Sequence, residues 1–304
     1  MPPFTSDPVF IAGDNRSGTT LLAIILDSHP ALILGPELDF REPEDLGPAL
    51  LRCIELLERD DPRVRGPGVE AAPPFTYTAQ FAKQCHRFGV ATQTLAELVH
   101  AAMRTTGTDL IEFADRCVLL DAIGEARRRA TGARRWGLKI QRELLHHADY
   151  AALWPRAKFV QIVRDGRDVA ASHLRSDRHL YYTSITHAAH GWAELIRETR
   201  SLVETGDVHE LRYEDLIADP EATLRRLLAF LELDWHPGVL DHTAAHHDLL
   251  ANPYRHPSVE AVSQPITRAA IGRYRADLSA EELATFHAIA GEWLTRMGYD
   301  GLTC

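Results

Sequence analysis

The feature that most constrains this chain is an apolar strand that runs into a glycine-bounded loop and then into a helix. Residues 9–12 are all apolar, Gly13 and Gly18 bound the loop, and a leucine-rich helical pattern follows from Leu21 to Leu26. The two glycines let backbone N–H groups close around an anion, and the helix adds the positive end of its dipole. The segment therefore predicts a phosphate-binding βα unit.

The cation of this loop does not stand where a nucleoside-triphosphate site needs it. A P-loop of that kind carries Lys after its second glycine and then a Ser or Thr that holds magnesium. Here Gly18 is followed by Thr19 and Thr20, and the cation, Arg16, precedes the glycine. The loop is built for phosphate, but its pattern does not favour ATP.

Three motifs resemble those of sulfotransferases that use 3′-phosphoadenosine 5′-phosphosulfate (PAPS). Residues 16–22, followed by residues 26–30, resemble the family's 5′-phosphosulfate loop. Residues 158–172 look like its 3′-phosphate motif, and residues 211–216, ahead of Asp219, are similar to a further stretch common in these enzymes. The motifs occur in the family's order and together span most of the chain.

Strand and helix patterns alternate along the rest of the chain, which is typical of a parallel sheet covered by helices. Short strands are expected at residues 136–140, 159–163 and 208–213, and helices between and after them, at residues 143–153 and 187–203 among others. We expect an α/β fold, a P-loop-like three-layer sandwich with a central, mainly parallel sheet.

We expect residues 1–304 to form one sulfotransferase domain that contains a helical insertion and a lid or binding loop. Leucines at helical spacing and a Pro/Gly-rich break at 61–74 mark a helical insertion over about 43–131, the expected wall of the acceptor pocket. Residues 234–275 begin with an irregular, His- and Pro-rich stretch that is too long for an ordinary connection. This segment is predicted to be a lid or binding loop.

The resemblance implies which residues bind the donor. The loop would hold the 5′-phosphosulfate, the motif at 158–172 the 3′-phosphate, and a closing loop near the carboxyl end would contact both. The implied donor-binding residues are Arg16, Ser17, Gly18, Thr19, Thr20, Arg164, Ser172, Ser263 and Arg273. Arg268 and Arg275 compete with Arg273, and Arg167 is expected to be structural because acids flank it.

Two further residues, with Arg16, are expected to carry the chemistry. Glu37 stands where the resembling enzymes place a catalytic glutamate, and a carboxylate there accepts the hydroxyl proton; the alternative is a solvated loop residue. Lys139 interrupts an apolar strand near a sheet end, where an ammonium group needs an anion such as a leaving phosphate. The alternative for Lys139 is an ion pair with an acid such as Glu143.

Composition narrows the classes of partner. A formal net charge of −10 argues against a general binder of nucleic acid or of anionic membranes. The four cysteines, Cys53, Cys85, Cys117 and Cys304, form no C-x-x-C pair, and no spacing of histidines and acids suggests a metal site. We see neither a signal peptide nor a membrane span, and we expect a cytoplasmic protein with reduced thiols.

The sequence thus predicts a sulfotransferase that moves a sulfuryl group from PAPS, without a metal, to a hydroxyl or amine of a small molecule. Aromatic residues in the insertion and near the lid, including Phe75, Phe81 and Trp235, favour a hydrophobic or phenolic acceptor. Two alternatives stay open at this point: a P-loop kinase or NTPase, and a nucleotide-binding protein without catalysis.

Overall fold

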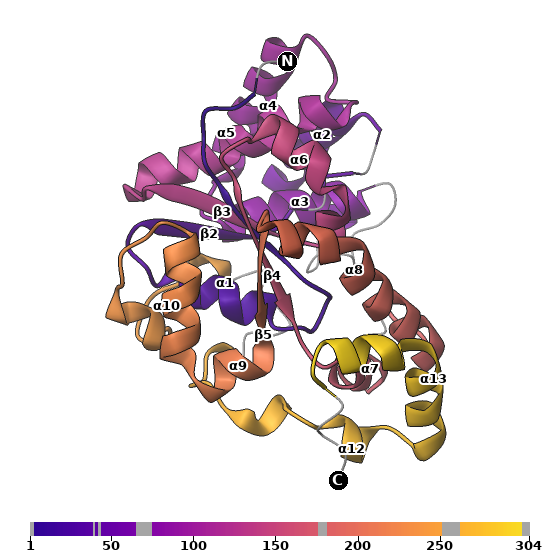
Figure 1. Ribbon diagram of the computed structural model, residues 1–304. Helices are drawn as coiled ribbons and strands as arrows, with labels where there is room; N and C mark the ends of the chain where they lie inside the picture. The colour runs from indigo at the N-terminus through magenta and orange to yellow at the C-terminus, as the bar shows by residue number, and fades with distance from the viewer. Residues whose placement is uncertain are drawn as a thin grey trace.

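The computed structural model describes residues 3–38, 40–41, 44–64, 75–175, 181–250 and 262–299, apart from the side chain at position 249, and all structural statements refer to these residues. Its centre is a five-stranded sheet in the order β2-β3-β1-β4-β5, with every neighbouring pair parallel (Figure 1). The strands are β1 (Val9–Ala12), β2 (Leu32–Glu37), β3 (Arg135–Gln141), β4 (Lys158–Val163) and β5 (Val208–Arg212). The predicted α/β class is confirmed.

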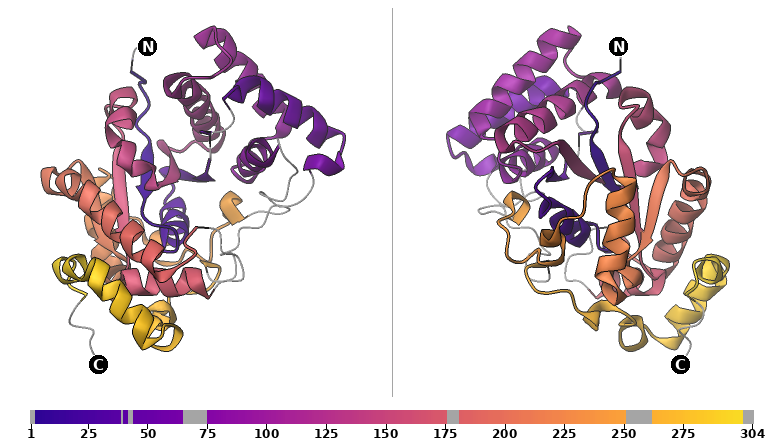
Figure 2. Two further views of the ribbon diagram at one scale, coloured as in Figure 1. Left: turned by 90° about the vertical axis from the view of Figure 1, so that its right-hand side faces the viewer. Right: turned by 60° about the vertical axis from the view of Figure 1, so that its left-hand side comes forward.

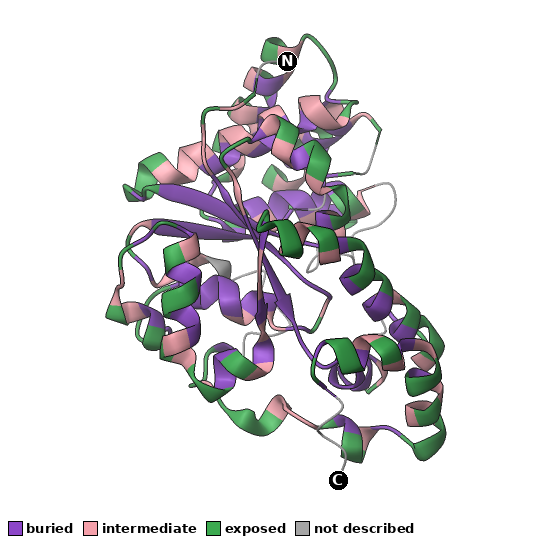
Figure 3. Cartoon of the chain, in the orientation of Figure 1, coloured by how far each residue is buried: buried purple, intermediate pink, exposed green. Residues whose placement is uncertain are grey.

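Alternate residues of each strand point to opposite faces of the sheet, and helices cover both faces, so both sets of side chains are buried. In β1, Phe10 and Ala12 join one apolar cluster, whereas Val9 and Ile11 join another. Figure 3 shows the strands as the buried centre of the molecule. The first face is covered by α2 (Leu46–Glu58), α3 (Thr76–Arg87), α4 (Thr92–Thr106), α5 (Phe113–Thr131) and α6 (His147–Leu153), and the second by α1 (Thr19–Asp27), α9 (Tyr213–Ala218) and α10 (Pro220–Phe230).

The segment between β2 and β3 is helical, as expected for residues 43–131. Helices α2, α3, α4 and α5 occupy it, with the 3₁₀ turn η1 (Pro62–Val64) after α2. The Pro/Gly-rich break predicted at 61–74 lies outside the described residues from position 65 onward. Helix α3 reaches β2, so the insertion borders the sheet edge that carries Glu37.

Three further helices form a third group with an apolar cluster of its own. Helices α7 (Gly166–Leu174), α8 (Ile185–Thr205) and α13 (Ala280–Arg296) share an apolar cluster that includes Val169, Trp192 and Phe286. In Figure 2, α13 lies along α8. A capping box begins α13, because Ser279 and Glu282 bond each other's backbone N–H groups. The other elements of the described residues are short: the 3₁₀ helices η3 (Arg142–His146), η4 (Pro237–Leu240), η5 (Asp248–Leu250) and η6 (Arg268–Ala270), and the α-helix α12 (Tyr274–Asp277).

Three local expectations differ from the structure. Strand β2 was not predicted, because it contains Gly35 and Pro36; Pro36 is tolerated since β2 is an edge strand. The helix expected at 143–153 begins as the 3₁₀ turn η3, and Tyr213 starts α9 rather than ending β5. Within the described ranges, no helix combines the length and apolarity that crossing a bilayer requires.

Candidate donor and catalytic site

The loop from Gly13 to Gly18 follows β1 and is pressed against its neighbours. A Cβ atom on Gly13 would lie 2.5 Å from the carbonyl oxygen of Ile162, and one on Gly18 would lie 2.7 Å from Cδ2 of Tyr213. Both glycines also have positive φ, 146° and 106°. Any side chain at either position would displace β4 or Tyr213, so the loop requires glycine at both ends.

Hydrogen bonds inside the loop fix the conformation of its backbone. The N–H and Oγ of Ser17 both donate to the carbonyl oxygen of Asp14, at 3.1 and 2.7 Å. Arg16 adopts a left-handed conformation with φ 71°. Helix α1 then begins after Gly18 without a capping side chain from any described residue. Its first-turn N–H groups are therefore available to a phosphate or sulfate oxygen.

The predicted phosphate-binding residues on the loop and on α7 meet. The Arg16 Nε donates to Oγ of Ser172 at 3.0 Å, and Nη1 of Arg164 donates to the carbonyl oxygen of Arg16 at 3.0 Å. Burial lowers the pKa of Arg16, and the positive charges of Arg164 and Arg273 lower it further. The Nε of Arg164 is buried without a partner among the described residues. A bound anion would relieve this accumulation of positive charge.

The closing loop is docked onto α7 by Asp168, a role that the sequence analysis missed. Its carboxylate accepts hydrogen bonds from the backbone N–H groups of Gly272 at 2.7 Å and Tyr274 at 3.0 Å. Arg164 lies 3.8 Å from Asp168 and also donates to the carbonyl oxygen of Ala270. Arg273 is thereby brought near Arg16 and Arg164, although it is exposed and bonds Asp277.

The remaining arginines of this region have other roles. Arg167 is buried in a bidentate pair with Asp165, which confirms that it is structural. Arg175, which follows α7, extends to Glu282 at 3.2 Å on the surface. Arg275 lies over the ring of Tyr274. Arg164 and Ser172 are therefore the pair of this motif that reaches the loop.

Lys139 and Glu37 lie opposite each other on β3 and β2, in register. The Nζ of Lys139 is buried and donates to Oγ1 of Thr20 at 3.1 Å, so this ammonium group points to the end of the donor loop. Burial lowers its pKa to about 8; the Glu37 carboxylate opposes this shift and the guanidinium of Arg87 adds to it. The alternative ion pair with Glu143 is wrong, because Glu143 pairs with Arg41.

Glu37 ends the edge strand β2 and is half-buried, which places it at the carboxyl edge of the sheet beside the loop. Its Oε2 accepts a hydrogen bond from Nε2 of Gln141 at 3.1 Å. Gln141 ends β3, and its carbonyl oxygen accepts a hydrogen bond from the N–H of Gly13 at 3.3 Å. One residue thus connects the carboxylate of Glu37 to the donor loop.

Asp14 forms a second buried network that the sequence analysis did not find. Its Oδ2 accepts a hydrogen bond from the Tyr182 hydroxyl at 2.6 Å and lies 3.8 Å from Nη1 of Arg142. Burial raises the pKa of Asp14 to about 6, although Tyr182 and Arg142 favour its charged form. The sequence signal was a carboxylate inside a loop that otherwise gathers cations. Beside this network lies a cavity of about 240 Å³, lined by Arg142, Tyr181, Tyr182, His187, His190, Gly191, Glu194 and Arg197.

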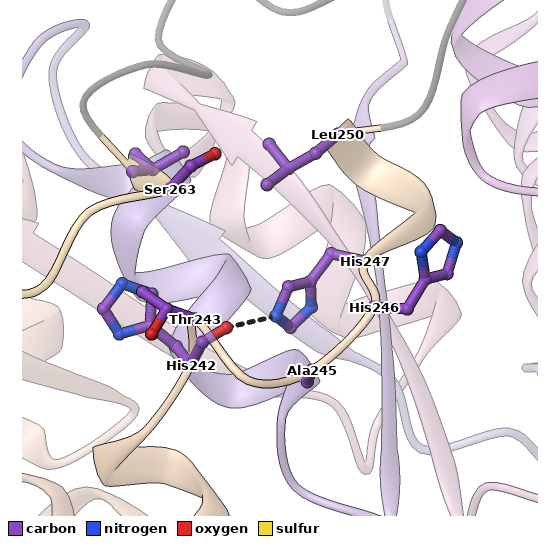
Figure 4. A pocket seen from close by; sticks show the side chains of 8 residues that line it. His242, Thr243, Ala245, His246, His247, Leu250 and Ser263 are labelled. Carbon is purple, nitrogen blue, oxygen red and sulfur yellow. Dashed lines mark hydrogen bonds between the residues drawn. The ribbon is translucent and has the colours of Figure 1, made fainter.

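The described part of the predicted lid contains a second cavity, of about 220 Å³ (Figure 4). Its lining is His242, Thr243, Ala245, His246, His247, Leu250, Val262 and Ser263. The His247 ring bonds Oδ2 of Asp27 at 2.7 Å and the carbonyl oxygen of His242 at 2.8 Å, which anchors this segment to the end of α1. Ser263 is exposed at the cavity, and the preceding residues 251–261 lie outside the described ranges.

Among the described residues, no group of three or more His, Cys, Asp and Glu side chains is arranged to hold a metal ion. The chemistry on offer is instead that of cations and backbone N–H groups around an anion. Beside them lie the carboxylate of Glu37 and the buried ammonium group of Lys139. This set fits a nucleotide that carries several anionic groups and a group to transfer.

Comparison with known proteins identifies the class. Residues 8–237 match the model of the sulfotransferase family, and this chain belongs to that family. It is 30% identical over 171 residues to the omega-hydroxy-beta-dihydromenaquinone-9 sulfotransferase Stf3 of Mycobacterium bovis, which covers 49% of this chain and 37% of that protein. It is 24% identical over 306 residues to protein-tyrosine sulfotransferase 1 of Danio rerio, covering 96% of this chain and 72% of that enzyme.

The fold has solved counterparts as well. The sulfotransferase domain of the Synechococcus PCC 7002 olefin synthase superposes with a TM-score of 0.62 at 20% identity, over 96% of this chain and 97% of that domain. The chain spans little more than a third of the length of the mycobacterial relative. The family and the fold predicted from the three motifs are therefore confirmed.

Proposed function

We propose that this protein transfers a sulfuryl group from PAPS to a hydroxyl group of a small acceptor. The observation that carries the proposal is the convergence of Glu37, Lys139 and Thr20 at the end of a loop that also gathers Arg16 and Arg164. The named activities of the relatives, on a hydroxylated dihydromenaquinone and on protein tyrosine, support an alcohol or phenol as acceptor.

The residues present fit the co-substrate. Arg164, Ser172 and Arg273 would hold the 3′-phosphate, where positive charge accumulates. The first-turn N–H groups of α1, with Arg16, Ser17, Thr19 and Thr20, would hold the 5′-phosphosulfate. Bound PAPS supplies the sulfuryl group, whose bond from sulfur to the bridging oxygen breaks as the acceptor oxygen bonds to sulfur.

Glu37 and Lys139 then have complementary tasks. Glu37 accepts the proton that the acceptor hydroxyl loses. Lys139 donates a hydrogen bond where negative charge develops on the leaving phosphate, and its buried position strengthens that interaction. With a pKa of about 8, Lys139 is mostly protonated at neutral pH, as this task requires.

The test is the Glu37→Gln variant, assayed with PAPS by the release of 3′-phosphoadenosine 5′-phosphate (PAP) in the presence of a panel of phenols and alcohols. We expect kcat to fall by about 10²-fold or more, while PAP binding changes by less than about twofold. Glu143→Gln is the matched control, since Glu143 is a nearby acid that pairs with Arg41. Near-normal turnover of Glu37→Gln would show that another group takes the proton.

A further inference from the structure

Tyr182 reaches the donor loop from the segment between α7 and α8, and the proposed mechanism does not use it. Its hydroxyl group donates a hydrogen bond to Oδ2 of Asp14 at 2.6 Å, across 168 residues of sequence. The side chain is fully buried, and burial raises the pKa of the hydroxyl well above its usual value, so the group stays protonated and donates. The donor loop is therefore held from outside at its own carboxylate.

Helix α8 makes room for this hydroxyl with a glycine. Gly191 lies in the interior of α8, where glycine is less favourable than alanine. A Cβ atom at position 191 would lie 2.5 Å from the hydroxyl oxygen of Tyr182 and 2.6 Å from Cε1 of the same ring. The carbonyl oxygen of Gly191 also accepts a hydrogen bond at 2.7 Å from Arg142, which lies 3.8 Å from Asp14. The packing of α8 thus depends on the position that the Tyr182 hydroxyl takes beside the loop.

Oxygen atoms of three successive loop residues are bonded by side chains from elsewhere in the chain. The three contacts are those of Tyr182 with the Asp14 carboxylate, of His173 with the carbonyl oxygen of Asn15, and of Arg164 with the carbonyl oxygen of Arg16. Carboxylate and carbonyl oxygens repel a phosphate or sulfate group. While these contacts hold, the negative atoms of the loop are engaged by the protein, and an anionic ligand meets the cations and N–H groups.

Asp14 is the member of this set that carries a full negative charge, and it lies two positions before Arg16, the cation of the loop. The charges that act on the pKa of Arg16 are the positive ones of Arg164 and Arg273, and Asp14 does not offset them. Without the Tyr182 hydroxyl, the carboxylate would be released to pair with Arg16 or to face the incoming phosphate. Either change would weaken the binding of an anion at the loop.

We propose that Tyr182 is a positioning residue for the donor, because it holds the carboxylate of Asp14 away from Arg16 and from the 5′-phosphate end of the nucleotide. The inference rests on the proposed binding of the 5′-phosphosulfate by the loop. It gives Tyr182 no contact with the nucleotide, so the effect of Tyr182 passes through Asp14. The effect is also confined to ligands that carry a 5′-phosphate.

The first test is calorimetric titration of Tyr182→Phe with PAP and with adenosine 3′-phosphate, which lacks the 5′-phosphate. We expect PAP to bind about tenfold more weakly than to the wild-type protein, the effect of losing one hydrogen bond to a charged group. The affinity for adenosine 3′-phosphate should change by less than about twofold, whereas a general loss of structure would weaken both ligands. Tyr181→Phe is the matched control, because Tyr181 is adjacent and 41% exposed.

The second test asks whether the effect passes through Asp14. In the Asp14→Asn background no charge remains to be held, so adding Tyr182→Phe should change PAP affinity by less than about twofold. Gly191→Ala should weaken PAP binding as Tyr182→Phe does, because the new Cβ atom displaces the hydroxyl. Gly291→Ala is its control, since a Cβ atom at that position in α13 lies 4.0 Å from the His287 ring, an ordinary contact.

The outcomes separate this inference from the function on which it rests. Unchanged PAP binding by Tyr182→Phe, or an equal loss for PAP and adenosine 3′-phosphate, overturns the positioning role. A full tenfold loss in the Asp14→Asn background overturns the route through Asp14. If Tyr182→Phe does not fold, Gly191→Ala and Gly291→Ala carry the same comparison between the two ligands. Failure of the wild-type protein to bind PAP would instead overturn the proposed function.

Discussion

At the scale of single residues, the buried carboxylate of Asp14 destabilises the fold when it is charged. It is 2% exposed and faces Tyr182 and Arg142, yet burial still raises its pKa to about 6 from 3.8. The folded protein therefore binds a proton more readily than the unfolded chain. Stability from this group is greatest at low pH and declines as pH rises through about 6.

The Asp14→Asn variant should therefore be more stable than the wild-type protein at pH 8, by on the order of 2 kcal/mol. The amide keeps a partner for Tyr182 and removes the buried charge. At pH 5 the difference should shrink, because wild-type Asp14 is then mostly protonated. Urea unfolding at the two pH values measures this. A stability difference that is the same at both would contradict the assigned burial of charge.

The residues of the site differ in whether a short stretch of sequence is enough to predict their role. Gly13, Arg16 and Gly18 were predictable because one short segment contains the strand, the loop and the helix start. Tyr182 and Gln141 were not, since each meets its partner across more than a hundred residues of sequence, Asp14 and Glu37 respectively. Such pairs depend on tertiary packing, which periodicity does not encode.

At the scale of elements, polar contacts fasten segment 241–250 of the predicted lid to the core, with Asp248 paired to Arg127 and a buried contact made through His247. His247 joins Asp27 at the end of α1, and the same Asp27 accepts a hydrogen bond from the N–H of Leu34 in β2. The histidine and the carboxylate are both nearly buried. The contact therefore ties segment 241–250 to the helix that follows the donor loop.

The variant His247→Ala should release this segment. We expect limited proteolysis to cleave the chain near residues 241–250 several times faster than in the wild-type protein, because local opening exposes the backbone. His246→Ala is the matched control, since His246 is adjacent and its side chain is 83% exposed. If both variants are cleaved at the wild-type rate, Asp27 does not hold the lid through His247.

The elements themselves were predicted unevenly, for a physical reason. Strands β1, β3 and β4 are apolar runs, and their positions follow from the sequence to within a residue. Strand β2 could not be predicted, because Gly35 and Pro36 are typical of a turn. The structure accommodates both residues because β2 is an edge strand. Since β2 carries Glu37, the position of the proposed base relative to Lys139 emerged only from the register of β2 with β3.

At the scale of the whole molecule, the fold gathers positive charge into one place on an otherwise acidic protein. The formal net charge is −10, yet Arg16, Arg164 and Arg273 come close enough to lower the pKa of Arg16. Parallel strands make this possible, because the loops after β1 and β4 leave the same edge of the sheet. The account as a whole depends on this site preferring a 3′-phosphorylated nucleotide.

The most direct test is calorimetric titration of the protein with PAP, ADP and ATP, each with and without magnesium. We expect PAP to bind at least tenfold more tightly than ADP, with an affinity that magnesium does not change, because arginines and backbone N–H groups hold both phosphates. Arg164→Ala should remove most of the preference for PAP over ADP. Tighter binding of magnesium-ATP than of PAP would contradict the account.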